Sequence, residues 1–248
     1  MFAFLSSYIF PVDPEMTSVS LKLAPPSVNH WFGCDDLGRD VFSRVLSGTR
    51  KTLSISITVN ILALLIGGLI GSLSGYFGRW TDVLLTQFSD AFMAIPGILL
   101  ALMLLSVGGR GIAMLILTLG IVFFPSYSRI FRNHIRVIKE QDFVLQARLL
   151  QISTPRLLLV HILPALIPQL LPSIVLGLGN AAVAEASLSY LGLGVQPPDA
   201  SWGKMLAEGQ SYIFVAPWMV VFPSAFLIIY ILGLYFISEE VRMIRRNH

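Results

Sequence analysis

Charged residues are scarce in this sequence. Only 12% of its 248 residues are Asp, Glu, Lys or Arg, whereas 55% are hydrophobic. A soluble domain usually has about 25% charged residues, so the deficit indicates a membrane protein. The formal net charge is only +3 and the basic residues are not clustered in one soluble domain, so we expect no nucleic-acid partner.

Cysteine is nearly absent as well. Cys34 stands alone, which excludes an intrachain disulfide and a cysteine-based zinc site. His30, Asp35 and Asp36 lie near it in sequence, but the spacing fits no standard zinc pattern, so we predict no metal site. The chain also lacks a G-x-x-x-x-G-K-S/T phosphate loop, and its apolar runs hold no nucleophile–base pair, so we predict neither a catalytic residue nor a bound cofactor.

Long apolar runs make up most of the chain. A helix that crosses a bilayer needs about 20 mostly apolar residues. Five runs are candidates: 52–78, 83–109, 111–128, 157–184 and 209–238. They predict an all-α fold, a polytopic bundle of five transmembrane helices embedded in a lipid bilayer. We expect the third run to end at Pro125.

The N-terminal stretch is too short to be a sixth span. MFAFLSSYIF provides only ten residues before Pro11, and it lacks the basic region and cleavage site of a signal peptide. It is either a remnant of a first span or a segment that lies in the membrane interface, and we favour the remnant. We therefore expect a truncated first span and an extracytoplasmic segment over 1–51, and a transmembrane domain over 52–248.

The basic residues predict the orientation in the membrane. Five alternating spans place residues 79–82, 129–156 and 239–248 on the same side. Ten of the 17 Lys and Arg lie on that side, concentrated in 129–139 and at the C-terminus. Because Lys and Arg are enriched in cytoplasmic loops, we predict that this side is cytoplasmic.

One cytoplasmic segment, QDFVLQARLLQISTPRLLLVHILP at 141–164, is more polar than the runs around it. A helix at 100° per residue would have two opposed apolar stripes, which are Phe143, Ala147, Leu150 and Leu145, Leu149, Ile152. Two stripes suggest contact on both sides, one of them with a partner protein. The alternative is a linker helix in the lipid headgroups, but such a helix usually has a Lys/Arg-rich face, which this segment lacks.

This segment resembles the coupling loop of ABC-importer permeases. In their peptide/nickel branch the loop reads roughly Y-V-E-A-A-R-A-L-G-A-S-D…R-H-I-L-P. The matching residues are Phe143, Val144, Ala147, Arg148, Leu150, Ser153, Arg156, His161, Ile162, Leu163 and Pro164. HWFGCDDLGRDVFSRVLSGTR at 30–50 and EASLSYLGLGVQPPDASWG at 185–203 are also similar to that family. The chain is thus identified as a member of the dipeptide/oligopeptide/nickel permease family, which implies the type I ABC-importer permease fold.

The resemblance implies partners and a role for the cytoplasmic loop. Two permease subunits, expected to be a heterodimer, would form one path across a bacterial or archaeal cytoplasmic membrane. Two cytoplasmic ATPases that bind ATP and Mg would drive transport, and an extracytoplasmic solute-binding protein would deliver a peptide or a nickel or other metal chelate. The loop at about 129–164 would transmit the motion of the ATPases. The expected coupling residues are Phe143, Leu145, Gln146, Ala147, Arg148, Leu150 and Gln151.

Two positions depart from the family pattern. Leu145 replaces the usual glutamate, which enlarges an apolar stripe and removes a possible ion pair. Gln151 replaces the usual glycine, and we expect it to continue the helix and extend a longer polar arm. We hypothesise that the ATPase cleft for this subunit is more apolar than usual, or that the partner permease carries the stricter motif.

Two acids in or beside the apolar runs, Asp90 and Glu185, are candidates for the translocation pathway, because ionisable groups inside a membrane are costly. Each also has a structural interpretation. Glu185 would be hydrogen-bonded to a neighbouring helix near the outer end of its own helix. Asp90 would pair with a base such as Arg79 near the cytoplasmic face.

An ATP-independent channel or secondary transporter is the alternative function. It would predict internal repeats and more charged residues within the membrane. It would also leave the cytoplasmic helix without a role.

Overall fold

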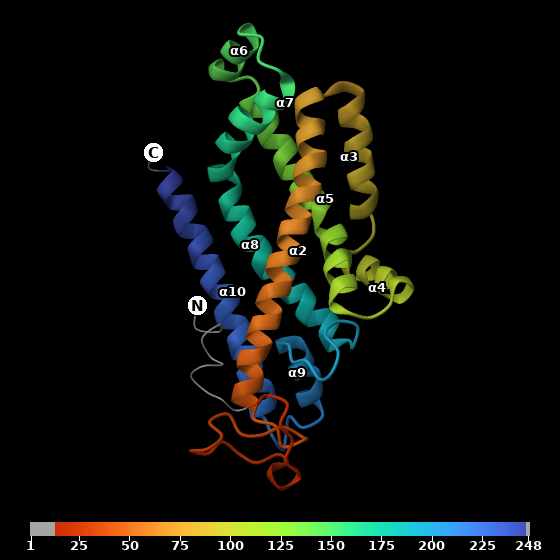
Figure 1. Ribbon diagram of the computed structural model, residues 1–248, viewed down its shortest axis with the longest axis vertical. Helices are drawn as coiled ribbons and strands as arrows, with labels where there is room; N and C mark the ends of the chain where they lie inside the picture. Colours follow the sequence, from red (N-terminus) through yellow and green to blue (C-terminus); the bar gives the residue numbers. More distant parts are fainter. Residues whose placement is uncertain (1–12, 247–248) are drawn as a thin grey trace. The chain divides into compact units, whose positions relative to one another are not determined.

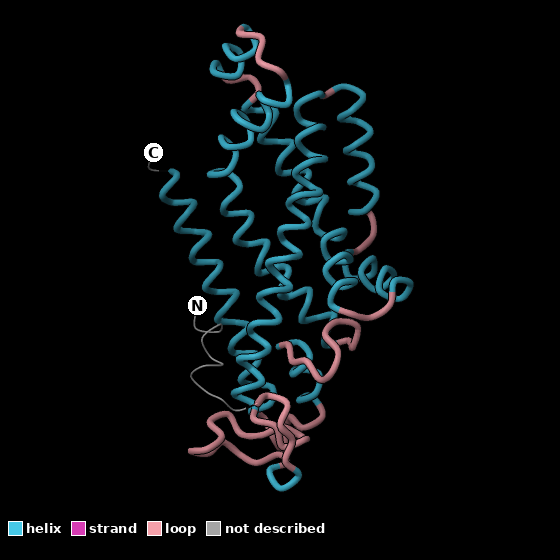
Figure 2. Tube along the Cα trace, viewed as in Figure 1, coloured by secondary structure: helices cyan, strands magenta, loops and turns pink. Residues whose placement is uncertain are grey.

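The regular structure of this protein is helical, as predicted. A computed structural model describes residues 13–246 and, apart from residue 148 and residues 244–246, their side chains. Within this range no strand forms, and an isolated bridge joins Cys34 to Asp40 (Figure 2). The predicted remnant of a first span lies outside the described residues.

The helices are labelled in Figure 1. In chain order they are η1 (Val19–Leu21), α2 (Val41–Phe77), α3 (Arg79–Met93), α4 (Gly97–Gly108), α5 (Ile112–Ile138), α6 (Asp142–Leu149), α7 (Thr154–Arg156), the π-helix η2 (Leu157–Ile162), α8 (Leu163–Tyr190), α9 (Trp202–Gln210) and α10 (Trp218–Arg246). Among the described residues, four stretches are long and apolar enough to cross a membrane, namely Val41–Phe77, Ile112–Ile138, Thr154–Tyr190 and Trp218–Met243.

The remaining predicted run, 83–109, is a broken pair of helices rather than one straight span. α3 and α4 are bent by 85° relative to each other across a short break. Pro96 lies in this break, where it lacks the amide hydrogen needed to continue the helix and disfavours a helical conformation at Ile95. Residues 13–246 therefore contain four helices that are long and apolar enough to cross a membrane, or five if the bent pair counts as one.

Other helix boundaries also differ from the predicted runs. α2 begins at Val41 rather than at 52, because the carboxylate of Asp40 accepts a hydrogen bond from the amide of Ser43 at 2.8 Å and caps the helix. α5 continues through Pro125 to Ile138, since a membrane helix can lose one hydrogen bond without unravelling. α10 begins at Trp218 rather than at 209, directly after Pro217, a residue that suits the start of a helix.

The chain forms two compact units. Of the described residues, the first unit comprises 13–58, 102–116 and 178–234, and the second comprises 59–101, 117–177 and 235–246.

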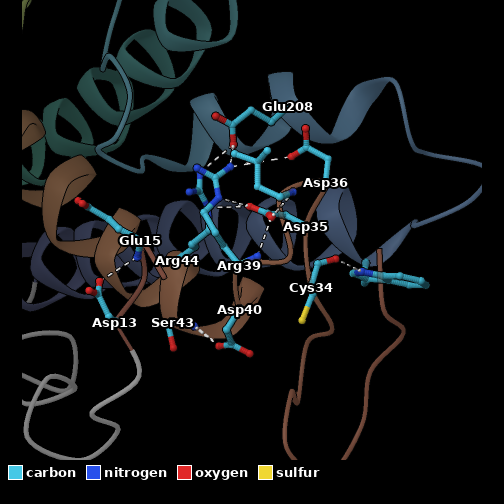
Figure 3. Close-up of polar contacts among 12 residues, drawn as sticks. Asp13, Glu15, Cys34, Asp35, Asp36, Arg39, Asp40, Ser43, Arg44 and Glu208 are labelled. Atoms are coloured by element: carbon cyan, nitrogen blue, oxygen red, sulfur yellow. Dashed lines mark hydrogen bonds and ion pairs between the residues drawn. The ribbon is translucent and has the colours of Figure 1, made fainter. Parts of the chain in front are cut away.

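In the first unit, aromatic and ionic contacts hold the loop before α2 to α9 and α10. Phe32 stacks on Phe222, with ring centroids 3.7 Å apart and planes 4° from parallel. Arg44, which is 1% exposed, points toward two carboxylates (Figure 3). Its Nη2 lies 2.7 Å from Oε2 of Glu208 and its Nε lies 3.4 Å from Oδ2 of Asp35. A buried guanidinium needs such partners, so the loop and α9 are fixed together by this charge.

Cys34 is fully buried in the same loop. Its carbonyl oxygen accepts a hydrogen bond from the indole Nε1 of Trp218 at 3.0 Å. Burial, together with the negative charges of Asp40 and Asp35, raises the pKa of the Cys34 thiol from 9.0 to about 11. The thiol is therefore protonated at neutral pH, and Cys34 contributes to the packing of the loop.

In the second unit, Asp82 joins three helices. α3 turns back beside the end of α2 (Figure 1), and the carboxylate of Asp82 is only 7% exposed. It accepts hydrogen bonds from Ser74 Oγ of α2 at 2.5 Å and from Nε and Nη2 of Arg132 of α5 at 2.5 and 2.8 Å. Arg136 of α5 also donates to it. The carboxylate thus compensates two arginines next to apolar helices.

Cys34 should react slowly with thiol reagents in the folded protein. A thiol whose pKa is two units higher has roughly 100-fold less thiolate at pH 7, and burial restricts access further. We expect maleimide to label the native, detergent-solubilised protein far more slowly than the same protein in sodium dodecyl sulfate. Ser20→Cys in a Cys34→Ser background is the exposed control. Equal labelling rates for Cys34 and the control would contradict the burial of this residue.

Asp82→Asn should destabilise the protein, because it leaves Arg132 and Arg136 without a compensating charge. Since Arg136 is partly exposed, we expect a loss of about 2–3 kcal/mol in the free energy of unfolding. The measurement is unfolding of the purified protein in detergent. Glu239→Gln is the matched control, because Glu239 pairs with Arg242 at an exposed position and such pairs contribute about 0–1 kcal/mol. Equal losses in the two variants would mean that Asp82 does not hold the helices together.

Candidate functional site

The predicted coupling segment is a short helix carried between two long ones. α6 follows α5 after a turn in which the amides of Lys139 and Gln141 bond to the carbonyls of Ile135 and Ile138. After α6 the chain turns again and continues through α7 and η2 into α8. Figure 1 shows α6 and α7 beside the ends of α5 and α8. The residues of α6, α7 and η2, and the ends of α5 and α8 next to them, belong to the second unit.

One side of α6 packs against its own unit. Val144 is 0% exposed and Ala147 is 5% exposed. They belong to an apolar cluster with residues of α5, η2 and α8, which are Phe131, Ile135, Ile138, Leu157, Ile162, Leu166 and Leu170. These contacts hold α6 firmly on the end of its unit, so that displacing the helix would displace α5 and α8.

The other side of α6 is apolar and exposed. Leu149 and Leu150 are 83% and 76% exposed, and Phe143 and Leu145 are 39% and 46% exposed. Gln146 is also exposed, and the side chain of Arg148 is outside the described part. Three of these apolar residues lie on α6 and Leu150 directly follows it, and their exposure to water is costly.

The two stripes predicted from the sequence were only partly right. Ala147 is buried, but Phe143 and Leu150 of the same predicted stripe are exposed. Ile152, predicted to lie with exposed Leu149, instead packs against the buried cluster. Leu150 and Ile152 deviate because α6 ends at Leu149, so residues 150–152 do not follow the helical angle of 100° per residue.

Gln151 ends the helix, whereas the sequence led us to expect that it would continue it. Its φ is +57°, in the left-handed region that glycine occupies most easily. The amide of Ile152 bonds to the carbonyl of Ala147 at 3.2 Å, the six-residue closure of a Schellman C-cap. Ile152 and Ala147 also share the apolar cluster, as is common in this cap. Glutamine here keeps the turn that the family builds with glycine, at a cost in backbone strain.

Asp90 and Glu185, the two pathway candidates, belong to different units and have different surroundings. Asp90 of α3 forms an ion pair with Arg129 of α5, not with Arg79, at 2.9 Å between Oδ1 and Nη2. Both side chains are about half exposed, at 50% and 54%. A role of Asp90 in the pathway stays a prediction.

Glu185 is completely buried near the end of α8. Its carboxylate accepts hydrogen bonds from Thr52 Oγ1 of α2 at 3.0 Å and from Ser189 Oγ at 2.6 Å. This is the hydrogen-bonded environment that the structural interpretation describes. A role of Glu185 in the pathway stays a prediction.

Sequence reasoning missed Asp82 as an organising residue. A signal was present in the sequence. Arg129, Arg132 and Arg136 are spaced for one face of a helix, and Asp82 directly precedes the apolar run 83–109. What the sequence did not reveal was which acid faces which arginine. Asp82 forms ion pairs with Arg132 and Arg136, and Asp90 forms an ion pair with Arg129.

The described residues contain no group of three or more His, Cys, Asp or Glu positioned to hold a metal ion. The acids near Cys34 instead pair with bases. Asp35 contacts Arg39 at 2.6 Å, and Asp40 contacts His30 at 3.0 Å.

The fold and the site together define a polytopic membrane subunit of the permease class, with a broken span and a short helix fixed on the ends of two membrane helices. The chain belongs to the family described as "Binding-protein-dependent transport system inner membrane component", which matches residues 67–241. It is therefore a multi-pass protein of the inner membrane, and the resemblance derived from its motifs is confirmed.

Curated relatives cover nearly the whole chain. It is 35% identical to the dipeptide transport system permease protein DppC of Alkalihalophilus pseudofirmus, over 91% of this chain and 74% of that protein. It is 34% identical to the glutathione transport system permease protein GsiD of Pectobacterium atrosepticum, over 97% of this chain and 80% of that one. A putative peptide transport system permease protein of Brucella suis biovar 1 is 37% identical over 97% and 81%.

A solved structure confirms the fold. One chain of the inward-facing MetNI methionine ABC transporter superposes with a TM-score of 0.65, covering 81% of this chain and 96% of that one. Sequence identity is 16%, so this similarity concerns the fold alone.

Gln151→Gly should stabilise the protein, because glycine adopts the left-handed conformation without the steric cost of a Cβ atom. We expect a gain of about 1 kcal/mol in the free energy of unfolding in detergent. Gln146→Gly is the matched control, an exposed position inside α6, where glycine should instead cost about 1 kcal/mol. Destabilisation of similar size by both substitutions would show that residue 151 is not left-handed.

Proposed function

We propose that this chain is the membrane-spanning subunit of an ATP-driven importer of peptides, and that α6 receives the motion of the ATPases. The observation that carries this proposal is the asymmetry of α6. One side is packed into the end of its unit, while Leu145, Leu149 and Leu150 are exposed on a segment that the basic residues assign to the cytoplasm. A cytoplasmic partner that covers these leucines would remove their cost of exposure to water.

The structure suggests how a push on α6 would reach the membrane. Val144 and Ala147 are packed against α5 and η2, and the Schellman cap closes the other end of the helix. Well-packed interiors transmit displacement rather than absorbing it. Movement of α6 would therefore carry the ends of α5 and α8 with it, as rigid-body switching requires.

The expected partners follow from family membership. A second permease subunit would complete the path, as a heterodimer, and two cytoplasmic ATPases would bind ATP and Mg and perform the hydrolysis. An extracytoplasmic solute-binding protein would deliver the solute, so this chain itself would have no enzymatic activity. Family membership also favours this function over an ATP-independent channel or secondary transporter.

The class of solute is inferred from relatives. The three relatives above are named for dipeptide, glutathione and peptide transport, which favours a peptide over a nickel or other metal chelate. The direct test is uptake of radiolabelled alanylalanine or glutathione into vesicles that contain the whole complex, with ATP enclosed on the ATPase side and the solute-binding protein on the other. ATP-dependent uptake of neither peptide by the wild-type complex would contradict the proposed solute class.

Leu150→Asp should uncouple transport from ATP hydrolysis. A carboxylate at this exposed position would have to be buried without a partner in an apolar contact, so we expect uptake per ATP hydrolysed to fall at least about tenfold. Ala147→Asp is a poorer test, because Ala147 is buried and its replacement would disturb packing. Met243→Asp, at a 44% exposed apolar residue near the end of α10, is the matched control. Coupled transport by the Leu150→Asp complex would rule out this residue as an ATPase contact.

A further inference from the structure

A polar cavity lies between α3 and α5 in the second unit. Its volume is about 270 Å³, slightly below the range of about 300–1,000 Å³ that is usual for drug-sized ligands. Most of the side chains that line it carry hydrogen-bonding or charged groups. They are Thr86, Ser89, Asp90, Pro125, Ser128, Arg129, Arg132 and Asn133. A cavity of this composition within apolar helices is suited to a small polar solute rather than to a lipid chain.

Asp90 and Arg129 supply opposite charges to this cavity. They form an ion pair of 2.9 Å, yet each is about half exposed. A half-exposed charge on a membrane helix is expensive against hydrocarbon, so such residues face water or a partner molecule. The pair therefore indicates that the cavity is accessible to a polar ligand.

Asp82, which lies about two helical turns from Asp90 on α3, shows what a purely structural acid looks like in this protein. It is 7% exposed, and donors from Ser74, Arg132 and Arg136 converge on it. Among the residues that the structure describes, Asp90 has one ion-pair partner, Arg129, which also lines the cavity. The contrast separates a carboxylate that fixes helices from one that is able to exchange its partner.

We propose that this cavity is a transient binding site for the two charged ends of a peptide, with Asp90 accepting the ammonium group and Arg129 donating to the carboxylate. The proposal rests on the proposed function and names the part of the chain that recognises the solute. A zwitterion replaces one internal ion pair by two charge-assisted contacts and leaves the net charge of the cavity unchanged. Binding of this kind is favourable enough for entry and weak enough for release, which transport requires.

Hydroxyl groups in the cavity complete the site. Ser89 Oγ lies 3.4 Å from Ser128 Oγ, and both side chains are buried, at 5% and 4% exposure. Their hydroxyls can donate to or accept from a peptide group lying between the two charges. Such contacts do not depend on the side chains of the peptide, so the site would recognise the charged ends and the backbone of the solute.

The test uses the whole complex in vesicles of phosphatidylcholine and phosphatidylglycerol, with its solute-binding protein present. For Asp90→Asn and for Arg129→Gln, we expect uptake of radiolabelled alanylalanine to fall roughly tenfold, the loss of one charge-assisted contact. Glu239→Gln, which removes a charge from the exposed pair with Arg242, should leave uptake unchanged. Uptake of alanylalanine by Asp90→Asn at the wild-type rate would overturn the proposal.

The double variant Asp90→Arg/Arg129→Asp distinguishes a ligand site from a structural ion pair. It restores an ion pair, so a merely structural role predicts recovery of uptake. A binding role predicts that uptake stays low, because a peptide entering in the same orientation would meet a like charge at each of the two positions. Recovery by the double variant would therefore contradict the proposal.

The remaining outcomes identify other occupants. Loss of the second permease subunit on purification of the Arg129→Gln complex would make the cavity a subunit interface. Normal uptake by Asp90→Asn in these vesicles, but loss in vesicles of phosphatidylethanolamine, would make it a lipid-headgroup site. Either result overturns the proposal. Failure of the wild-type complex to import any peptide would instead contradict the proposed function itself.

Discussion

The second unit depends on the compensation of charge beside hydrocarbon. Three arginines occur within the last turns of α5, and each needs a carboxylate or water, because an unpaired charge in an apolar environment is costly. Asp82 satisfies two of them and ties α3 and α5 to Ser74 of α2. The end of α5 is thereby fixed, and α6 is packed on it through Val144 and Ala147. α6 owes its defined position to this arrangement.

Much of the fold could be predicted, because the cost of burying polar groups in lipid leaves a strong signal in the sequence. Four apolar runs appear as spanning helices, and the proline-containing run 83–109 is a bent pair. Helix ends were less predictable. Whether a proline breaks a helix, as Pro96 does, or is tolerated, as Pro125 is, depends on neighbouring helices that satisfy the backbone. Local sequence does not contain that information.

The position of the short helix α6 was predictable, but the burial of its residues was not. The similarity to the family motif predicted where α6 lies. Which residues are buried depends on where the helix ends, and the motif does not specify that. The left-handed Gln151 shows that the backbone turn is kept without glycine, since the packing of Ile152 on the cluster stabilises it. The pairing of Asp90 with Arg129 instead of Arg79 required the three-dimensional arrangement, because Arg129 lies 39 residues from Asp90 in sequence and Arg79 is much nearer.

The central claim is that the exposed side of α6 contacts an ATPase in the cytoplasm. Photo-cross-linking tests it most directly, using Leu149→Cys in a Cys34→Ser background, labelled with a benzophenone maleimide in the assembled complex, with Met243→Cys as the comparison. The account predicts a cross-link from position 149 to the ATPase that changes in yield when ATP is added. Absence of that cross-link, or labelling of position 149 by a membrane-impermeant maleimide from outside intact cells, would contradict it.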